Sequence, residues 1–208
     1  MMRIDNKNIE NLRKIKKLLI VVDMINGFVR KGALAHEEIA EIIPENIKLV
    51  KSFLDDSESA VCMVRDSHTK DAAEFKTFPE HCLAGTYESE LVDELKEYEK
   101  DSLVYLKNST NLVFAQNFLE DIKNMENLEE VVLNGCLTDY CIKNGAISLK
   151  NLFDQDNRNI DVIIDEAGVT TFDGEGHNRE IVQRSSLDDM AGNGIVLVKN
   201  YGSETWKR

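Results

Sequence analysis

The protein has 208 residues and a net charge of −13, because 38 Asp and Glu outnumber 25 Lys and Arg. Since a typical domain has about 150 residues, we expect one domain over residues 1–208. An acidic surface repels phosphate backbones and anionic lipid, so we expect no nucleic-acid partner and no membrane partner. The longest purely apolar runs span five residues, far short of the roughly 20 that cross a bilayer.

The cysteines and the N-terminal segment indicate a cellular compartment. The four cysteines are scattered and form no C-x-x-C pair, which does not make a disulfide framework. Residues 1–17 are charged and polar and lack the apolar core of a secretion signal. We therefore expect a reduced, cytoplasmic protein.

Strands and helices alternate along the chain. Residues 1–16 are predicted to form a helical N-terminal extension, with a short basic helix from residue 9. Apolar, β-branched runs then predict six strands, at residues 17–23, 59–65, 102–106, 130–134, 160–164 and 194–198. Apolar residues at helical spacing predict helices between them, with stripes over 39–54, 114–122 and 142–149. This order predicts an α/β fold, a doubly wound, six-stranded, mostly parallel sheet with helices on both faces.

Reactive side chains follow the predicted strands. In an open parallel sheet, ligands bind beyond the carboxyl ends of the strands. Asp23 follows the first strand, Asp66 and His68 follow the second, Lys107 follows the third, and Cys141 follows the fourth. We therefore expect these five side chains to meet at one edge of the sheet.

Cys141 lies where the fourth predicted strand gives way to a helix. Thr138 or Asp139 can cap that helix, which leaves Cys141 in its first turn. There the helix dipole lowers a thiol pKa, and free N–H groups can hold an oxyanion. The alternative is a small apolar residue packed in the core, which is how most free cysteines behave. We expect Cys136, on the strand side of the turn, to be a packing residue.

Asp23 and Lys107 also allow two interpretations each. A carboxylate at the position of Asp23 can act as a general base, although aspartates at strand ends also cap loops. Lys107 can stabilise a thiolate and an oxyanion beside it, although most lysines are solvated.

Histidines supply a possible metal site in one loop. Asp66 and His68 stand two residues apart, on one side of an extended segment, and His81 follows in the same loop. One carboxylate and two imidazoles with open positions are typical of a catalytic metal site. We interpret His36 and His177, which lack such neighbours, as surface or capping residues.

These motifs together resemble the nicotinamidase branch of the isochorismatase-like cysteine hydrolases. Residues 21–28 read Val-Val-Asp-Met-Ile-Asn-Gly-Phe and residues 66–68 read Asp-Ser-His. Residues 78–86 read Phe-Pro-Glu-His-Cys-Leu-Ala-Gly-Thr, and residues 135–141 read Gly-Cys-Leu-Thr-Asp-Tyr-Cys. The resemblance extends in order from about residue 17 to residue 165 and implies the isochorismatase-like hydrolase fold.

The resemblance also implies a set of catalytic roles. Cys141 would attack a carboxamide carbon after Asp23 takes its proton, and Lys107 would stabilise the charged states. The backbone N–H groups of Leu137 and Cys141 would hold the oxyanion, and the Cys136–Leu137 peptide would be cis. The reaction would convert nicotinamide to nicotinate and ammonia through a thioester on Cys141, in the recycling of pyridine nucleotides.

A metal site and a ring pocket follow from the same resemblance. Asp66, His68 and His81 would hold one divalent ion, zinc in the first place and iron or manganese otherwise, and Glu74 would be a further ligand. Phe28 would line the pocket for the substrate ring. Many members of the family form dimers or larger assemblies, so the resemblance implies a homo-oligomer.

Two other functions compete with this interpretation. The same thiol chemistry could act on another small amide, a carbamoyl or a ureido compound, because Ile25 and Gly27 stand where the family pattern has a glutamine and an acid. A non-catalytic module that binds a small molecule or a metal is the second alternative. Asp23, Lys107 and Cys141 argue against it together, since a binding module has no need of all three.

Overall fold

A computed structural model describes residues 9–203 and contains one six-stranded sheet with the strand order β3-β2-β1-β4-β5-β6. Every neighbouring pair in the sheet is parallel. The strands are β1 (Lys17–Val22), β2 (Ser59–Asp66), β3 (Leu103–Lys107), β4 (Glu130–Cys136), β5 (Asp161–Thr170) and β6 (Val196–Val198). The predicted fold class and all six predicted strands are therefore confirmed, with bounds that shift by a few residues.

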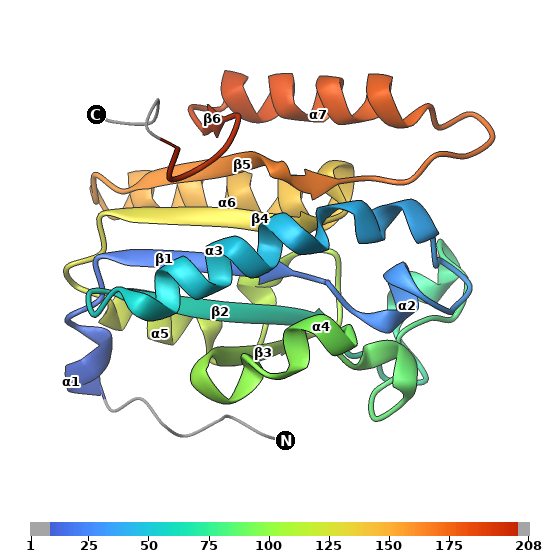
Figure 1. The fold of residues 1–208 in the computed structure, drawn as a ribbon, viewed down its shortest axis with the longest axis horizontal. Helices are drawn as coiled ribbons and strands as arrows, with labels where there is room; N and C mark the ends of the chain where they lie inside the picture. The colour runs from blue at the N-terminus through green and yellow to red at the C-terminus, as the bar shows by residue number, and fades with distance from the viewer. Residues whose placement is uncertain (1–8, 204–208) are drawn as a thin grey trace.

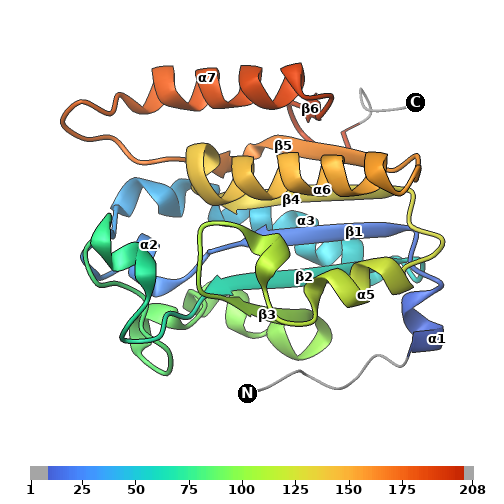
Figure 2. The same ribbon diagram turned by 180° about the vertical axis from the view of Figure 1, so that it is seen from behind.

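Helices cover both faces of this sheet (Figures 1 and 2). Helices α3 and α4 lie on the face seen in Figure 1, and α5 and α6 lie on the opposite face, seen in Figure 2. Helix α7 lies beside α6 and β6, at the β6 edge of the sheet. The helices are α1 (Ile9–Leu12), α2 (Asn26–Val29), α3 (Ile43–Asp55), α4 (Asp93–Lys96), α5 (Phe118–Asn124), α6 (Lys143–Gln155) and α7 (Arg179–Gly192).

Each face of the sheet has its own apolar core, because neighbouring side chains of a strand point to opposite faces. Leu18, Ile20 and Val22 pack in the core beneath α5 and α6, whereas Leu19 and Val21 pack in the core beneath α3. All five are at most 1% exposed. This burial on both faces explains why the strand reads as a continuous apolar run.

Three local features differ from the prediction. The stripe over 39–54 forms two elements, a 3₁₀ helix (Glu37–Ile42) and α3, whose first turn contains Pro44. Proline lacks an N–H and fits that position of a helix. Strand β5 continues to Thr170 because the register against β4 shifts between Leu133 and Gly135, which leaves a bulge at residues 165–168. Of the predicted N-terminal extension, the structure has α1, and residues 1–8 lie outside the described residues.

The order of the strands reverses direction between β1 and β4, which is where ligands bind in such sheets. Gly135 permits the close approach of these strands near their carboxyl ends. A Cβ atom at this position would lie 2.1 Å from the carbonyl oxygen of Val22, and its φ of 108° also favours glycine. No helix within residues 9–203 is both long and apolar enough to cross a membrane.

Candidate active site

Lys107 lies at the centre of a buried cluster at the carboxyl ends of the strands. Its Nζ is 2.8 Å from Oδ2 of Asp23, 2.5 Å from Oδ1 of Asp66 and 3.4 Å from Sγ of Cys141. None of these four residues is more than 5% exposed. The structure thus brings together the four side chains that the sequence placed after separate strands, and Lys107 is not a solvated surface lysine.

Burial and neighbouring charges set the protonation of these groups. Burial and the charge of Asp66 raise the pKa of Asp23 to about 6, against the lowering effect of Lys107. Burial opposes the charge on Lys107, but the two carboxylates hold its pKa well above the usual value. Burial also acts against ionised Asp66, yet Lys107 and His68 lower the pKa of Asp66. The cluster therefore contains one cation shared by two carboxylates, and Asp23 is the carboxylate closer to accepting a proton.

Cys141 differs from its predicted state. It lies in a π-helical turn (Thr138–Ile142) that precedes α6, rather than in the first turn of an α-helix. Burial raises the pKa of its thiol well above the usual value, in spite of the nearby charge of Lys107. The prediction of a lowered thiol pKa is therefore wrong, because loss of hydration outweighs the favourable charges. Cys141 retains its proton at rest and has Asp23 as a hydrogen-bond partner for it.

The segment before Cys141 has an unusual backbone. The Cys136–Leu137 peptide is cis, as the resemblance implied. The carbonyl of Leu137 accepts hydrogen bonds from the N–H groups of Tyr140 and Ile142, and the N–H of Cys141 between them is not among its donors. Cys136 is fully buried and its Sγ donates to the carbonyl of Asp23 at 3.2 Å, which fits the predicted packing role.

Thr138 and Asp139 do not cap the following helix, contrary to the prediction. The hydroxyl of Thr138 donates to Oε1 of Gln183 in α7 at 2.8 Å. The carboxylate of Asp139 accepts from the hydroxyl of Thr171 and lies 2.9 Å from Nε2 of His177. We name residues 136–141 the nucleophile segment. It is attached by side chains to the loop after β5 and to α7, which short-range capping rules do not foresee.

Three predicted metal ligands converge beside this cluster. Ligand atoms of Asp66, His68 and His81 lie within 4.8 Å of one another, and all three residues are buried. Nδ1 of His68 lies 3.0 Å from Oδ1 of Asn108, and Nδ1 of His81 lies 2.8 Å from the carbonyl of Pro79. Since a carbonyl oxygen only accepts, each Nδ1 carries the proton. In the neutral ring each Nε2 then has a lone pair for a metal, and Nε2 of His68 has no hydrogen-bond partner among residues 9–203.

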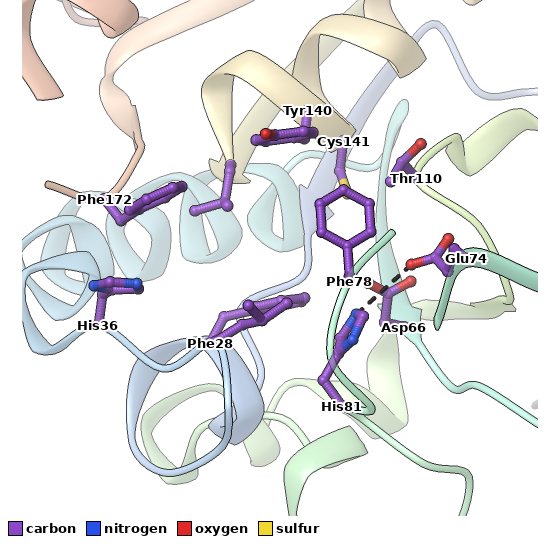
Figure 3. Close-up of a pocket in the computed structure, with 12 residues that line it drawn as sticks. Phe28, His36, Asp66, Glu74, Phe78, His81, Thr110, Tyr140, Cys141 and Phe172 are labelled. Atoms are coloured by element: carbon purple, nitrogen blue, oxygen red, sulfur yellow. Dashed lines mark ion pairs between the residues drawn. The ribbon is translucent and has the colours of Figure 1, made fainter. Parts of the chain in front are cut away.

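Glu74 completes this group of donors. Its Oε1 lies 3.4 Å from Nε2 of His68 and 3.6 Å from Nε2 of His81, the latter pair marked in Figure 3. Burial and the charge of Asp66 raise the pKa of Glu74. The two imidazoles and two carboxylates are a donor set that fits a divalent metal ion. The buried Nε2 of His68, which has no partner among the described residues, fits the same role.

A cavity of about 130 Å³ opens onto both groups (Figure 3). Its walls are mainly aromatic and aliphatic, and no Lys or Arg of the described chain lines it. The lining residues are Phe28, Leu34, His36, Asp66, Glu74, Phe78, Thr110, His81, Leu137, Tyr140, Cys141 and Phe172. Phe28 therefore lies where it was expected, in the wall of the cavity.

Sequence reasoning missed two histidines. His36 lines the cavity, and His177 contacts Phe172, another lining residue, as well as Asp139. The interpretation as a surface or capping residue is wrong for His177, whereas His36 does occupy the N-cap position of the 3₁₀ helix (Glu37–Ile42) and its side chain is 32% exposed. No local pattern marks either residue, because each acts on segments far away in the sequence.

These observations define a parallel α/β protein whose site contains a buried thiol, a lysine–carboxylate cluster and a set of metal-binding side chains. The model of the isochorismatase domain family matches residues 17–191. Nicotinamidase 1 of Arabidopsis thaliana is 28% identical over 90% of this chain and 87% of its own length. A probable inactive nicotinamidase of the same plant is 26% identical over 74% of this chain and 81% of its own length.

A solved structure agrees with these matches. N-carbamoylsarcosine amidase from Thermoplasma acidophilum superimposes with a TM-score of 0.74 and 25% identity, over 91% of this chain and 99% of that one. The chain belongs to the isochorismatase domain family. Both plant relatives are named as nicotinamidases, one of them as probably inactive, and the solved structure is that of an amidase.

Proposed function

We propose that the protein hydrolyses nicotinamide to nicotinate and ammonia with the help of a bound divalent metal. One observation carries this proposal. The thiol of Cys141 and the metal donors Asp66 and His81 line a single, mostly apolar cavity, and Lys107, Asp23 and His68 lie next to them. The name of the Arabidopsis relative supports the choice of nicotinamide.

The reaction uses the arrangement around Cys141. Asp23 takes the thiol proton as Sγ attacks the carboxamide carbon, and the backbone N–H groups of Leu137 and Cys141 hold the oxyanion. Asp23 then returns the proton to the leaving nitrogen, which departs as ammonia and leaves a thioester. A water molecule gives its proton to Asp23 and attacks the thioester carbon. Sγ departs as the acid forms, and the proton returns from Asp23 to the thiol.

Lys107 holds Asp23 in its basic, ionised form between these steps. Without the ammonium group 2.8 Å away, burial would keep Asp23 protonated and unable to act as a base. The pKa of about 6 gives Asp23 a proton affinity near neutral pH, which suits a group that takes and returns a proton.

The metal ligands of the proposal are Asp66, His68, His81 and Glu74. Zinc suits two imidazoles with carboxylate oxygens best, and iron or manganese would use the same donors. When bound, the ion supplies a Lewis acid that can accept the lone pair of an aromatic ring nitrogen. Phe28 is assigned to the wall that the substrate ring contacts.

The second candidate is another small amide, and the similarity to N-carbamoylsarcosine amidase favours it. That substrate carries a carboxylate, which needs a cationic side chain in the wall, because the carboxylates of Asp66 and Glu74 already balance the charge of the proposed metal. The cavity offers Asp66 and Glu74 and no lysine or arginine side chain on its lining. The chemistry of the wall therefore favours a neutral, flat amide over an acidic carbamoyl compound. A homo-oligomer, a cytoplasmic location and a role in pyridine-nucleotide recycling remain predictions from the sequence.

Ammonia release from nicotinamide tests the proposal, measured with and without a strong chelator. We expect release that the chelator abolishes and that added zinc restores. Elemental analysis of His81→Ala should show loss of metal, with Arg184→Ala as a control that retains it. Release from N-carbamoylsarcosine alone would support the second candidate. No release from any small amide would contradict both and favour a non-catalytic module, as the probable inactive relative suggests.

A further inference from the structure

Three aromatic rings are stacked at one end of the cavity. The ring of Phe172 lies between His177, at a centroid distance of 3.9 Å and an angle of 7°, and His36, at 4.7 Å and 27°. Figure 3 shows Phe172 and His36 at the opposite end of the cavity from Glu74 and His81. His36 precedes the 3₁₀ helix (Glu37–Ile42), and Phe172 and His177 both lie in the loop between β5 and α7. The stack thus forms the wall of the cavity away from the metal ligands.

Both nitrogens of His177 face oxygen atoms that accept hydrogen bonds. Nδ1 lies 3.0 Å from the carbonyl of Phe172, and Nε2 lies 2.9 Å from Oδ2 of Asp139. A neutral imidazole has a single N–H and can satisfy only one of these acceptors. The other oxygen of Asp139 accepts from the hydroxyl of Thr171, as an ionised carboxylate does. Two protons on the imidazole and none on Asp139 satisfy every contact.

We propose that His177 is an imidazolium that positions the Phe172 wall of the cavity. The N–H at Nδ1 donates to the backbone carbonyl of Phe172, and the N–H at Nε2 donates to Asp139 in the nucleophile segment. The charged ring lies flat on the phenyl face of Phe172. A cation against an aromatic face is attractive, and more so where water is excluded. Positioned in this way, Phe172 selects substrates with a flat, uncharged ring. This inference rests on the proposed function, because it concerns the substrate of that cavity.

The other charged groups near the stack have partners of their own. Glu38 accepts from the N–H of Asp173 and lies 3.6 Å from Nδ1 of His36. Arg179 pairs with Glu41 at 2.8 Å, and its N–H donates to Asp173. Asp139 is therefore the carboxylate in direct contact with His177, and its side chain is only 9% exposed.

The nucleophile segment keeps other attachments when His177 is changed. Thr171 still donates to Asp139, and Gln183 connects Thr138 to the carbonyl of Val169. Phe172, in contrast, loses the hydrogen bond to its backbone carbonyl and its link to Asp139 when the N–H donors of His177 are removed. We therefore expect a change at His177 to weaken substrate binding much more than the chemical step.

Nitrogen NMR of the whole protein, labelled with ¹⁵N-histidine, tests the charge without any substrate. The chain has four histidines, so single variants assign the four rings. At pH 7 we expect both nitrogens of the His177 ring to be protonated, and we expect this pair of signals to disappear in His177→Phe. A neutral, single-proton His177 would overturn the proposal whatever the enzyme hydrolyses. If the charged ring is found but nicotinamide is not turned over, the proposed function fails and the charged wall stands.

Steady-state kinetics tests the positioning role, with nicotinamide or with whichever small amide is turned over. His177→Phe preserves a ring against Phe172 and removes both N–H donors. We expect KM to rise about tenfold, the equivalent of roughly one lost hydrogen bond, and kcat to stay within about threefold. Arg184→Ala, at an exposed position of α7, is the control and should change neither constant. Unchanged KM, or a fall in kcat alone, would overturn the positioning role.

Discussion

Two buried polar clusters in this fold are built in opposite ways. In the catalytic cluster, Lys107 contacts Asp23 and Asp66, so each charge has an opposite charge within 2.8 Å. In the second cluster, at the bulge of β5, Asp165 is equally buried and has two amide neighbours, Asn46 and Asn134. Within the described residues, Oδ2 of Asp165, Oδ1 of Asn46 and both polar side-chain atoms of Asn134 have no hydrogen-bond partner. We name these three residues the bulge cluster.

The two clusters show that one pKa can have different causes. The pKa of Asp23 is raised to about 6 by burial and by the charge of Asp66, against the lowering effect of Lys107. Burial also raises the pKa of Asp165 to about 6, and the main opposing effect is a hydrogen bond from the N–H of Tyr201. Paired charges make Asp23 a group that can exchange a proton. Asp165 instead imposes a cost on folding, because the hydrogen bond from Tyr201 and the charge of Lys48 compensate its burial only in part.

The largest expected effect is the loss of turnover when Cys141, the uncharged member of the catalytic cluster, is replaced. Cys141→Ala removes the nucleophile but leaves the contacts of Lys107 with both carboxylates in place. We expect turnover to fall by about 10⁴-fold or more, while the melting temperature changes little. Ammonia release and thermal unfolding measure the two quantities. A large loss of stability with residual activity would instead support the packing role that cysteines usually have.

Removal of the central cation, Lys107, should destabilise the fold, whereas removal of the Cys141 thiol should not. Lys107→Met leaves Asp23 and Asp66 buried next to each other without a positive charge, which typically costs about 3–5 kcal/mol. We expect turnover to be lost and the free energy of unfolding to fall by that amount, measured by urea denaturation at pH 7.5. Lys143→Met, at a partly exposed surface pair, is the control and should change stability by less than about 1 kcal/mol. A variant as stable as the parent would refute the contrast between the clusters.

Most of the catalytic cluster could be predicted as a group of neighbours. Asp23, Asp66 and Lys107 each follow an apolar run, and parallel strands end at the same edge of a sheet. The position of His81 followed from its short distance in sequence to His68. These predictions succeed because they depend on local periodicity and on one rule of topology.

The parts that failed depend on contacts across the fold. The thiol pKa of Cys141 is set by burial, which a strand-to-helix boundary in the sequence does not reveal. His177 reaches Asp139 across 38 residues, and the bulge that buries Asp165 arises from a shift of register. Neither the contact between His177 and Asp139 nor the burial of Asp165 has a local sequence signal, because all three are ordinary polar residues in loops and strands.

The bulge cluster gives the next prediction, Asp165→Asn. The folded pKa of about 6 exceeds the ordinary value of 3.8, so protonation contributes stability that is full below pH 4 and lost as pH rises through about 6. Asparagine has no charge to bury and still accepts from the N–H of Tyr201. We expect the variant to gain about 2–3 kcal/mol over the parent at pH 7.5 and much less at pH 4.5. Urea denaturation at both pH values measures this, and an equal effect at both would contradict it.

The smallest effect is expected at Asn134, where both polar atoms of a fully buried side chain lack a partner. Asn134→Leu removes unpaired polar atoms and fills a similar volume, so we expect a gain of about 1 kcal/mol. Asn46→Leu is the matched control, because its Nδ2 donates to the carbonyl of Gly168 at 2.9 Å and the change leaves that carbonyl unpaired. The control should lose about 1–2 kcal/mol. A loss in Asn134→Leu as large as in the control would mean that ordered water pairs with this amide, since a buried water bonded to three polar groups is costly to displace.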